Sequence, residues 1–344
     1  AQTLEKIAAE GKKGFYEGEV AQKIVAAMHS NGGFVSLADL KNYRPRFSEP
    51  IRTAYRGNPI FAPRPPSGGA IVVLDALNIL ENFTLGKYKS NSSATYHLLA
   101  EALRRGHMDR SRYIGDPGFY DVPVEGIISK KRARELAKTI SFKSASSNKS
   151  MSPDDFLEES KDTTHYSIID EDGNAVSNTY TLGYSFGSGV TIPGTGILMN
   201  NHMNNFAYRY GDKSIRGRTA SPANKFDSGK RPMSTMTPVM VFNREGELQL
   251  ITGSPGGAAI PAAVLRVITG IIDFDLNIGE ATMLPRIHKD WPYEDLDYES
   301  TASSDVIAIL QNLGHKMEAS KTMGSTQSIH IKDGFNHGYA DLRR

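Results

Sequence analysis

The spacing of apolar residues changes at a serine-rich segment, and this change limits the fold more than any other feature. Residues 1–140 are mainly helical in pattern, with one hairpin predicted over residues 51–63. Residues 141–152 contain six serines and no Val, Leu or Ile, which is typical of a linker. Beyond it, strand-like runs surround turns near residues 172–174, 245–246 and 333–334. Hairpins mixed with separate helices predict an α+β fold with a largely antiparallel sheet.

Composition excludes several classes of function. The 344 residues include 40 Lys and Arg against 38 Asp and Glu, so no overall charge favours nucleic acid or an anionic membrane. Cysteine is absent, which excludes disulfides, thiolate zinc sites, iron–sulfur clusters and a cysteine nucleophile. The histidines show no metal-ligand spacing. We therefore predict no metal and no other cofactor.

Neither a membrane span nor a signal peptide is predicted. The most apolar stretch, residues 259–274, has Arg266 in its middle and Asp273 near its end. Residues 1–18 are charged and amphipathic, which predicts a helix rather than a signal peptide. Because the chain opens inside regular structure, we expect it to be a portion of something longer.

Two motifs contain groups suited to nucleophilic chemistry. The sequence DTTH, residues 162–165, lies where the linker-like segment meets the first strand of the hairpin region. The sequence GSPGG, residues 253–257, lies between a predicted strand and a predicted helix, where backbone N–H groups can stabilise an oxyanion. Each motif alone is a weak signal, because threonine is common in strands and glycine is common in turns.

Together, and in this order, the motifs indicate a family. The stretch from residue 163, TTHYSIIDEDGN, resembles the start of the small subunit of γ-glutamyltranspeptidases. The resemblance continues through KRPMSTMTPVMVF, GSPGGAAIPAAVLRVI, ATMLPRIHKDW and MGSTQSIHI. It reaches back through FYEGEVA, APRPPSGG and AEALRRGHMDRSRYIGDP, which look like the second half of the large subunit. It therefore covers nearly the whole chain.

The resemblance implies an N-terminal-nucleophile hydrolase fold, a four-layer αββα sandwich. Residues 1–162 would be the C-terminal part of the large subunit, with a linker over residues 141–162. Residues 163–344 would be the small subunit. The N-terminal part of the large subunit is then expected to be missing.

The resemblance also implies catalytic roles. The precursor is expected to cut itself between Asp162 and Thr163, after which Thr163 supplies both the nucleophilic hydroxyl and, as its α-amine, the base. This is chemically coherent, because a threonine hydroxyl needs a base and an α-amine titrates near neutral pH. Thr181 matches the threonine whose hydroxyl forms a hydrogen bond with the nucleophile. Gly256 and Gly257 match the backbone oxyanion hole.

The matched donor-binding positions include three departures from the family. Ser234 and Thr235 match the serine pair that binds the donor α-carboxylate, with threonine as the second hydroxyl. In the best-studied members, the donor α-amine meets an Asn, a Gln and an Asp. The equivalent positions here are Gly183, His202 and Asn205, and all three differ.

We expect an autoprocessing enzyme that cleaves γ-glutamyl amides such as glutathione and passes the acyl group to water, an amino acid or a peptide. His165 is expected to pack against its neighbours or to orient them rather than to catalyse, because the α-amine already fills the role of base. One alternative is an acylase of the same fold acting on glutaryl or other side-chain amides, including β-lactam precursors. Another is an inactive fragment or binding module. Family members are typically periplasmic, secreted or surface-bound, so we expect a periplasmic or secreted protein.

Replacing Thr163 tests the expected maturation. The protein should split between Asp162 and Thr163 without added protease, because the Thr163 hydroxyl attacks the preceding carbonyl. Thr163→Ala should remain one chain and be inactive, as measured by intact mass and an activity assay. Normal cleavage of that variant, with alanine at the new terminus, would contradict the mechanism.

Overall fold

The computed structural model describes two compact units, one of them assembled from separate parts of the chain. The described residues are 1–147, 163–207 and 221–343. The smaller unit comprises Ala1–Ser48 and Leu182–Asn201, and the larger one comprises Glu49–Thr181 and His202–Arg344. Asp162 and residues 148–162 of the predicted linker lie outside the described residues. The predicted division into subunits after residue 162 would be a break in the covalent chain, which the two compact units do not test, so it stays a prediction.

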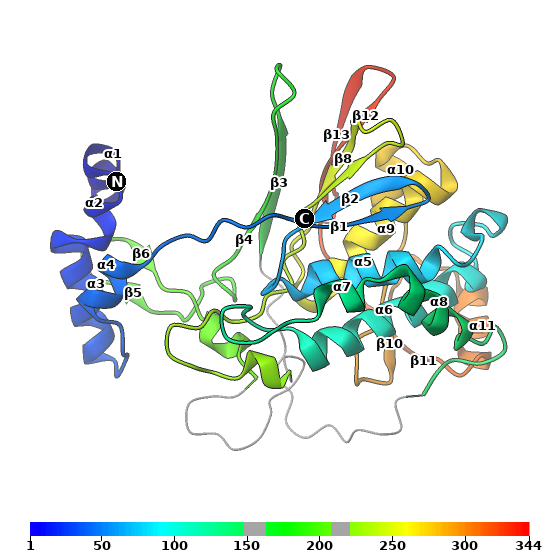
Figure 1. The fold of residues 1–344 in the computed structure, drawn as a ribbon, viewed down its shortest axis with the longest axis horizontal. Coiled ribbons are helices and arrows are strands. Elements are labelled where there is room, and N and C mark those ends of the chain that lie inside the picture. The colour runs from blue at the N-terminus through cyan, green and yellow to red at the C-terminus, as the bar shows by residue number, and fades with distance from the viewer. Residues whose placement is uncertain (148–162, 208–220, 344) are drawn as a thin grey trace. The chain divides into compact units, whose positions relative to one another are not determined.

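The larger unit is built on a six-stranded antiparallel sheet in the order β1-β2-β7-β8-β12-β13 (Figure 1). Its strands are β1 (Ile51–Tyr55), β2 (Asn58–Ala62), β7 (Val239–Phe242), β8 (Leu248–Thr252), β12 (Gln327–Lys332) and β13 (Phe335–Ala340). The three hairpins turn at Gly57, Gly246 and Gly334, each with a positive φ that glycine adopts without strain. These hairpins and the α+β class were predicted from the sequence and are confirmed.

Helices cover one face of this sheet. They are α5 (Gly68–Leu80), α6 (Ser93–Tyr113), α7 (Val124–Ile127), α8 (Lys130–Lys138), α9 (Ile260–Phe274) and α10 (Ile278–Met283). The unit also contains the short 3-10 turns η1 (Leu85–Lys87), η2 (His202–Asn205), η4 (Pro222–Asn224) and η5 (Gly257–Ala259). Every residue of α5 is buried. Alternate residues of β1 and β2, such as Ile51 and Ile60, join α5, α6 and α9 in one apolar core. A three-stranded sheet of β9 (Ile287–His288), β10 (Asp295–Glu299) and β11 (Lys316–Ser320), with α11 (Ser304–Asn312), completes the unit.

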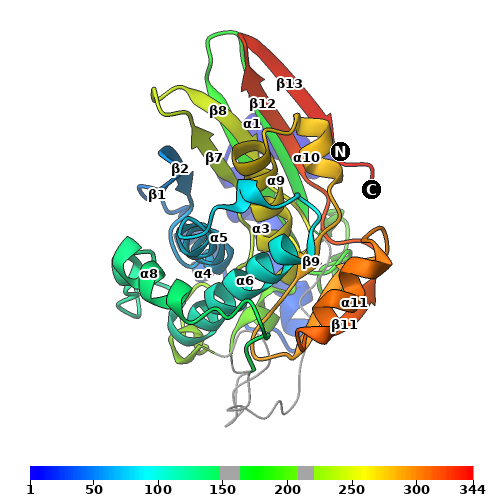
Figure 2. The same ribbon diagram turned by 90° about the vertical axis from the view of Figure 1, so that its right-hand side faces the viewer.

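A separate hairpin lies on the side of the six-stranded sheet away from α9 (Figures 1 and 2). It consists of β3 (Thr164–Ile169) and β4 (Ala175–Tyr180). The Ser167 hydroxyl donates to the Gln327 carbonyl oxygen at 2.9 Å, and the Ser177 hydroxyl donates to the Thr252 carbonyl oxygen at 3.1 Å. The hairpin therefore packs on β8 and β12, and the described layers run helices, sheet, hairpin.

The smaller unit combines α1 (Gln2–Glu10), α2 (Lys13–Tyr16), α3 (Gly18–Ser30) and α4 (Leu37–Asn42) with the short pair β5 (Thr191–Ile192) and β6 (Ile197–Leu198). Val20 and Ile24 of α3 pack with Ile192 in its core. Ser36 caps α4 in a capping box with Asp39.

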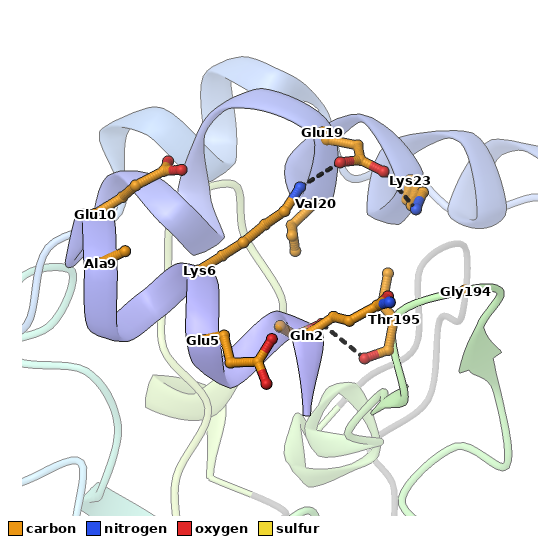
Figure 3. Close-up of a pocket in the computed structure, with 11 residues that line it drawn as sticks. Gln2, Glu5, Lys6, Ala9, Glu10, Glu19, Val20, Lys23, Gly194 and Thr195 are labelled. Carbon is orange, nitrogen blue, oxygen red and sulfur yellow. Dashed lines mark hydrogen bonds and ion pairs between the residues drawn. The ribbon is translucent and has the colours of Figure 1, made fainter.

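An open pocket of about 430 Å³ lies within the smaller unit (Figure 3). Its lining includes Lys6 and Lys23, which both pair with Glu19, beside Thr195. None of the predicted site residues lines it. We assign it no role.

The segment Gly257–Phe274, which contains α9, is long and apolar enough to cross a membrane by length and composition, but 78% of it is buried in the unit. Arg266 on α9 is 2% exposed. Its guanidinium donates to the carbonyl oxygens of Pro285 and Ser90, at 3.2 and 2.8 Å, and to the Asn91 side chain at 2.6 Å. We identify α9 as a core helix, so the described residues contain no clear membrane span.

A buried carboxylate on α6 holds the chain segment that follows α8. Glu101 Oε2 accepts hydrogen bonds from Arg105 Nη1 and Ser146 Oγ, both at 2.6 Å, and Oε1 accepts from Ser146 N at 2.9 Å. Burial opposes ionisation, but the hydrogen bonds from Ser146 and Arg105 outweigh it and lower the pKa of Glu101 to about 2.

Glu101→Gln should remove an acid-dependent part of the stability. The pKa of Glu101 lies below the ordinary 4.5, so the carboxylate stabilises the fold above pH 4.5 and loses this effect as the pH falls toward 2. The shift corresponds to roughly 3 kcal/mol of stability at neutral pH. Urea unfolding from pH 3 to 7 should therefore show a shallower acid dependence for Glu101→Gln than for wild type.

Glu135→Gln is the matched control for this experiment. Glu135 pairs with Lys138 at 2.8 Å on the exposed side of α8. Exposed ion pairs contribute little, so this variant should keep the wild-type dependence on pH. If Glu101→Gln also kept it, Glu101 would not be the group that titrates.

Candidate active site

Thr163 directly precedes β3 and is 8% exposed. The register of the hairpin pairs Thr164 with Tyr180, so one further step puts Thr181 opposite Thr163. Residues directly opposite in an antiparallel pair have Cβ atoms about 5 Å apart. The hairpin therefore brings together the two threonines that the sequence analysis selected.

The hairpin also leads Thr163 toward the glycine-rich turn. Ser177 donates to the carbonyl oxygen of Thr252, and farther along the hairpin the ring of His165 occupies the place that a Cβ on Gly253 would take. β3 and β8 therefore run in opposite directions, so that earlier residues of β3 lie beside later residues of β8. This direction carries Thr163 toward the residues that follow Gly253.

The glycine-rich turn presents backbone N–H groups at the start of α9. Gly256 and Gly257 have φ of 133° and 56°, in the region that favours glycine. Neither N–H has an acceptor within the described part of the chain. A Cβ on Gly256 would also lie 2.8 Å from the Cα of Gly324, so a larger residue does not fit. Such N–H groups, near the positive end of a helix, can stabilise an oxyanion.

His165 is neutral and fully engaged in hydrogen bonds. Its Nδ1 lies 2.8 Å from Thr179 Oγ1 and its Nε2 lies 3.2 Å from Ser167 Oγ. Burial lowers its pKa to about 4. These contacts agree with the expectation that His165 orients rather than catalyses.

Ser234 and Thr235 lie against the N-terminus of α5. The N–H of Gly68 donates to the carbonyl oxygen of Ser234 at 2.7 Å. A Cβ on Gly69 would overlap the carbonyl oxygen of Thr235, so this approach also requires glycine. The helix places its positive end beside the two hydroxyl residues, which favours a bound carboxylate.

Sequence reasoning assigned no role to two residues next to this contact. Ser67 caps α5 by accepting from the N–H of Ala70, and its hydroxyl donates to the carbonyl oxygen of Met236 at 2.8 Å. A serine followed by two glycines was the available signal for this helix start. Arg110 is fully buried, and its Cγ would lie 3.0 Å from a Cβ on Gly68. No local pattern marked Arg110, because it lies within a long helix.

His202 and Asn205 lie between Thr181 and the Ser234 loop. His202 Nε2 lies 3.0 Å from the carbonyl oxygen of Thr181, so this nitrogen carries the proton. Asn205 Nδ2 lies 3.4 Å from His202 Nδ1 and donates to the carbonyl oxygen of Met233 at 3.2 Å. The amide of Asn205 thus faces two acceptors.

Gly183 belongs to the smaller unit, so only its contacts within that unit are given. Its φ is 94°, and a Cβ at this position would overlap Asn201 Oδ1. That oxygen accepts from the N–H of Tyr184 at 3.1 Å. An asparagine at position 183 would therefore displace the Asn201 side chain.

One buried group has metal-ligand distances that histidine spacing did not predict. The nearest ligand atoms of His97, Glu101 and His315 all lie within 4.8 Å of one another. His97 Nδ1 lies 2.8 Å from His315 Nε2, and His97 Nε2 lies 2.8 Å from the carbonyl oxygen of Ser141. The Arg105 guanidinium already binds Glu101, and its charge opposes a divalent cation there. We interpret the group as a hydrogen-bonded cluster.

Comparison with known proteins places these features in one family. A family model described as Gamma-glutamyltranspeptidase matches residues 1–344. The glutathione hydrolase proenzyme of Escherichia coli (strain K12) is 39% identical over 345 residues, which cover 100% of this chain and 59% of the relative. The acylase ACY 1 proenzyme of Pseudomonas sp. (strain V22) is 37% identical over 317 residues, which cover 92% of this chain and 54% of the relative.

The crystal structure of a cephalosporin acylase from Bacillus halodurans has a TM-score of 0.85 and 30% identity, covering 99% of this chain and 60% of that one. Together with the family match, this similarity confirms the predicted N-terminal-nucleophile hydrolase fold. The chain spans about three fifths or less of the length of these relatives.

Gly256→Ala should slow acyl transfer. The new Cβ would lie 2.8 Å from Gly324, so the turn must shift and its N–H groups with it. Loss of one oxyanion donor typically lowers kcat by about 100- to 1,000-fold. Gly246→Ala is the control, because Gly246 also has a positive φ of 88° but open space around it. Equal kcat for the two variants would show that this turn is not the oxyanion hole.

Proposed function

This chain belongs to the gamma-glutamyltranspeptidase family, and on that premise we propose that it is a threonine-dependent enzyme that cleaves γ-glutamyl amides such as glutathione. The observation that carries the proposal is the register that puts Thr181 opposite Thr163 on a hairpin leading to the Gly256–Gly257 turn. The name glutathione hydrolase, carried by several relatives, supports the substrate class.

The reaction begins when the Thr163 hydroxyl attacks the γ-carbonyl of the donor. The α-amine of Thr163 takes the hydroxyl proton, and the Thr181 hydroxyl forms a hydrogen bond with the nucleophile. The N–H groups of Gly256 and Gly257 stabilise the negative charge on the carbonyl oxygen. The C–N bond then breaks, the leaving amine takes the proton, and an ester between the γ-glutamyl group and Thr163 remains. Attack by water, an amino acid or a peptide breaks this ester and restores the hydroxyl.

The donor carboxylate binds at Ser234 and Thr235. Both residues carry hydroxyls, and the start of α5 adds a positive partial charge through the Gly68 contact. We further propose that the precursor separates into large and small subunits at Asp162–Thr163, in keeping with the relatives named as proenzymes. A periplasmic or secreted location is part of the same proposal.

A second candidate function is hydrolysis of glutaryl or related side-chain amides. Asn205 directs its amide nitrogen toward Met233 and His202, so this position offers no carboxylate to a donor ammonium. A glutaryl donor has no ammonium and loses nothing from this arrangement. Several of the similar proteins are named as acylases, which supports keeping this candidate.

Kinetics on matched γ-glutamyl and glutaryl p-nitroanilides test the proposal. Release of p-nitroaniline by wild type, absent in Thr163→Ala, is the expected result, together with an acyl adduct on the residue 163–344 chain by mass spectrometry. A preference for the glutaryl compound selects the second candidate. No turnover of either compound would favour an inactive or binding protein.

Asn205→Asp should shift specificity toward the γ-glutamyl donor. A charge-assisted bond from an ammonium to a carboxylate contributes about 1.5–3 kcal/mol, against about 1 kcal/mol for a neutral pair. Recovery of about 1.4 kcal/mol would raise the kcat/KM ratio of γ-glutamyl to glutaryl substrate by roughly tenfold. Asn204→Asp, on an exposed neighbour in the same turn, adds the same charge and should leave the ratio unchanged. An unchanged ratio in Asn205→Asp would show that position 205 does not contact the amine.

A further inference from the structure

The turn at residues 323–327, between β11 and β12, touches both parts of the candidate active site. We propose that this turn fixes the nucleophile strand and the oxyanion turn relative to each other, with the hydroxyls of Ser254 and Ser167 as its two links. The inference rests on the proposed function, because it assigns a role in that reaction. Neither serine belongs to the predicted set of catalytic or substrate-binding residues.

The link to the oxyanion turn is a buried hydroxyl. Ser254 is fully buried, and its Oγ accepts from the N–H of Ser325 at 2.9 Å and donates to the carbonyl oxygen of Pro255 at 2.6 Å. Next to it, a Cβ on Gly256 would lie 2.8 Å from Gly324. The two turns therefore pack backbone against backbone, and the Ser254 hydroxyl fills the gap between them.

The link to the nucleophile strand runs through Gln327. Its N–H donates to the carbonyl oxygen of Gly253 at 3.2 Å, and its carbonyl oxygen accepts from Ser167 Oγ at 2.9 Å. Since Ser167 gives its proton to Gln327, it accepts from His165 Nε2 at 3.2 Å. One residue thus binds the start of the oxyanion turn and the middle of β3.

A buried ion pair forms hydrogen bonds with the turn at residues 323–327. Arg286 Nη1 donates to the carbonyl oxygen of Met323 at 2.6 Å, and its Nη2 donates to Thr326 Oγ1 at 3.2 Å. Asp341 Oδ2 accepts from Arg286 at 2.6 Å and from the N–H of Thr326 at 2.9 Å. The Arg286 and Asp341 side chains are fully buried. The turn is therefore a rigid support, because moving it would break its hydrogen bonds to a buried ion pair.

Such a support is expected to affect kcat more than it affects substrate binding. Oxyanion donors act on charge that develops in the transition state, so their distance from the nucleophile determines kcat. A displacement of about 1 Å at a catalytic group can cost about 100-fold. Ser254 and Ser167 are therefore positioning residues, which act through the Gly256–Gly257 turn and through β3.

The test compares Ser254→Ala with Ser328→Ala. Ser328 also forms a buried hydroxyl bond between β8 and β12, to Thr252 Oγ1 at 2.7 Å, but its hydroxyl is bonded to neither turn. We expect Ser254→Ala to lower kcat by roughly 10- to 100-fold with KM within about twofold. Ser328→Ala should lower stability and keep kcat.

Inhibitor affinity provides a second readout. The probe 4-boronobutanoate keeps the donor carboxylate and can form a tetrahedral adduct with the Thr163 hydroxyl, which places an oxygen at the oxyanion position. Glutarate occupies the same site without forming that adduct. Ser254→Ala should weaken 4-boronobutanoate by about the factor lost in kcat and leave glutarate unchanged.

Ser167→Ala keeps the inference testable if Ser254→Ala does not fold, because Ser167 is only half-buried. It should lower kcat and 4-boronobutanoate affinity in the same way. Wild-type kcat and affinity in the folded serine variants would overturn the positioning role while the proposed function stands. An inactive wild type that binds neither inhibitor would overturn the proposed function and this inference together.

Discussion

The absence of a side chain at Gly253 determines how the candidate site is assembled. The His165 ring occupies the space where a Cβ would be, so β3 can lie directly on the end of β8. A larger residue there would move the hairpin away from the sheet, and Thr163 and Thr181 with it. Burial also keeps His165 neutral, with a pKa of about 4, so this contact introduces no buried charge. This close approach to the backbone of Gly253 thus sets the position of Thr163, the proposed nucleophile.

The fold was predicted best where its determinants are local. Alternating apolar residues and glycines at positive φ marked the hairpins at Gly57, Gly173, Gly246 and Gly334, and the structure confirms them. The composition of the smaller unit was not predicted. Ile192 joins Val20 and Ile24 only through contacts between distant parts of the chain, and no local pattern encodes such contacts.

In the candidate site, too, the local features were predicted and the contacts between distant segments were not. The resemblance selected Thr163, Thr181 and the Gly256–Gly257 turn, and the register of one hairpin is enough to pair the two threonines. The roles assigned to these residues stay predictions. The contact of Gly68 with Ser234 joins segments more than 160 residues apart, and the Arg286–Asp341 pair joins two loops through buried charge. Neither contact has a sequence signature, because each depends on the packing of the complete unit.

Arg266 on α9 has a consequence for how the chain is handled before it folds. A guanidinium at the centre of an inserted helix costs about 3 kcal/mol on translocon insertion scales, whereas in the folded unit it donates to three oxygen atoms. This one side chain therefore favours the core over the bilayer for α9, which lies in the segment that is long and apolar enough to cross a membrane. For the proposed periplasmic or secreted location, it would act against lateral release of α9 into lipid during translocation. The residue that binds three oxygen atoms in the core thus also disfavours membrane insertion of an otherwise membrane-like segment.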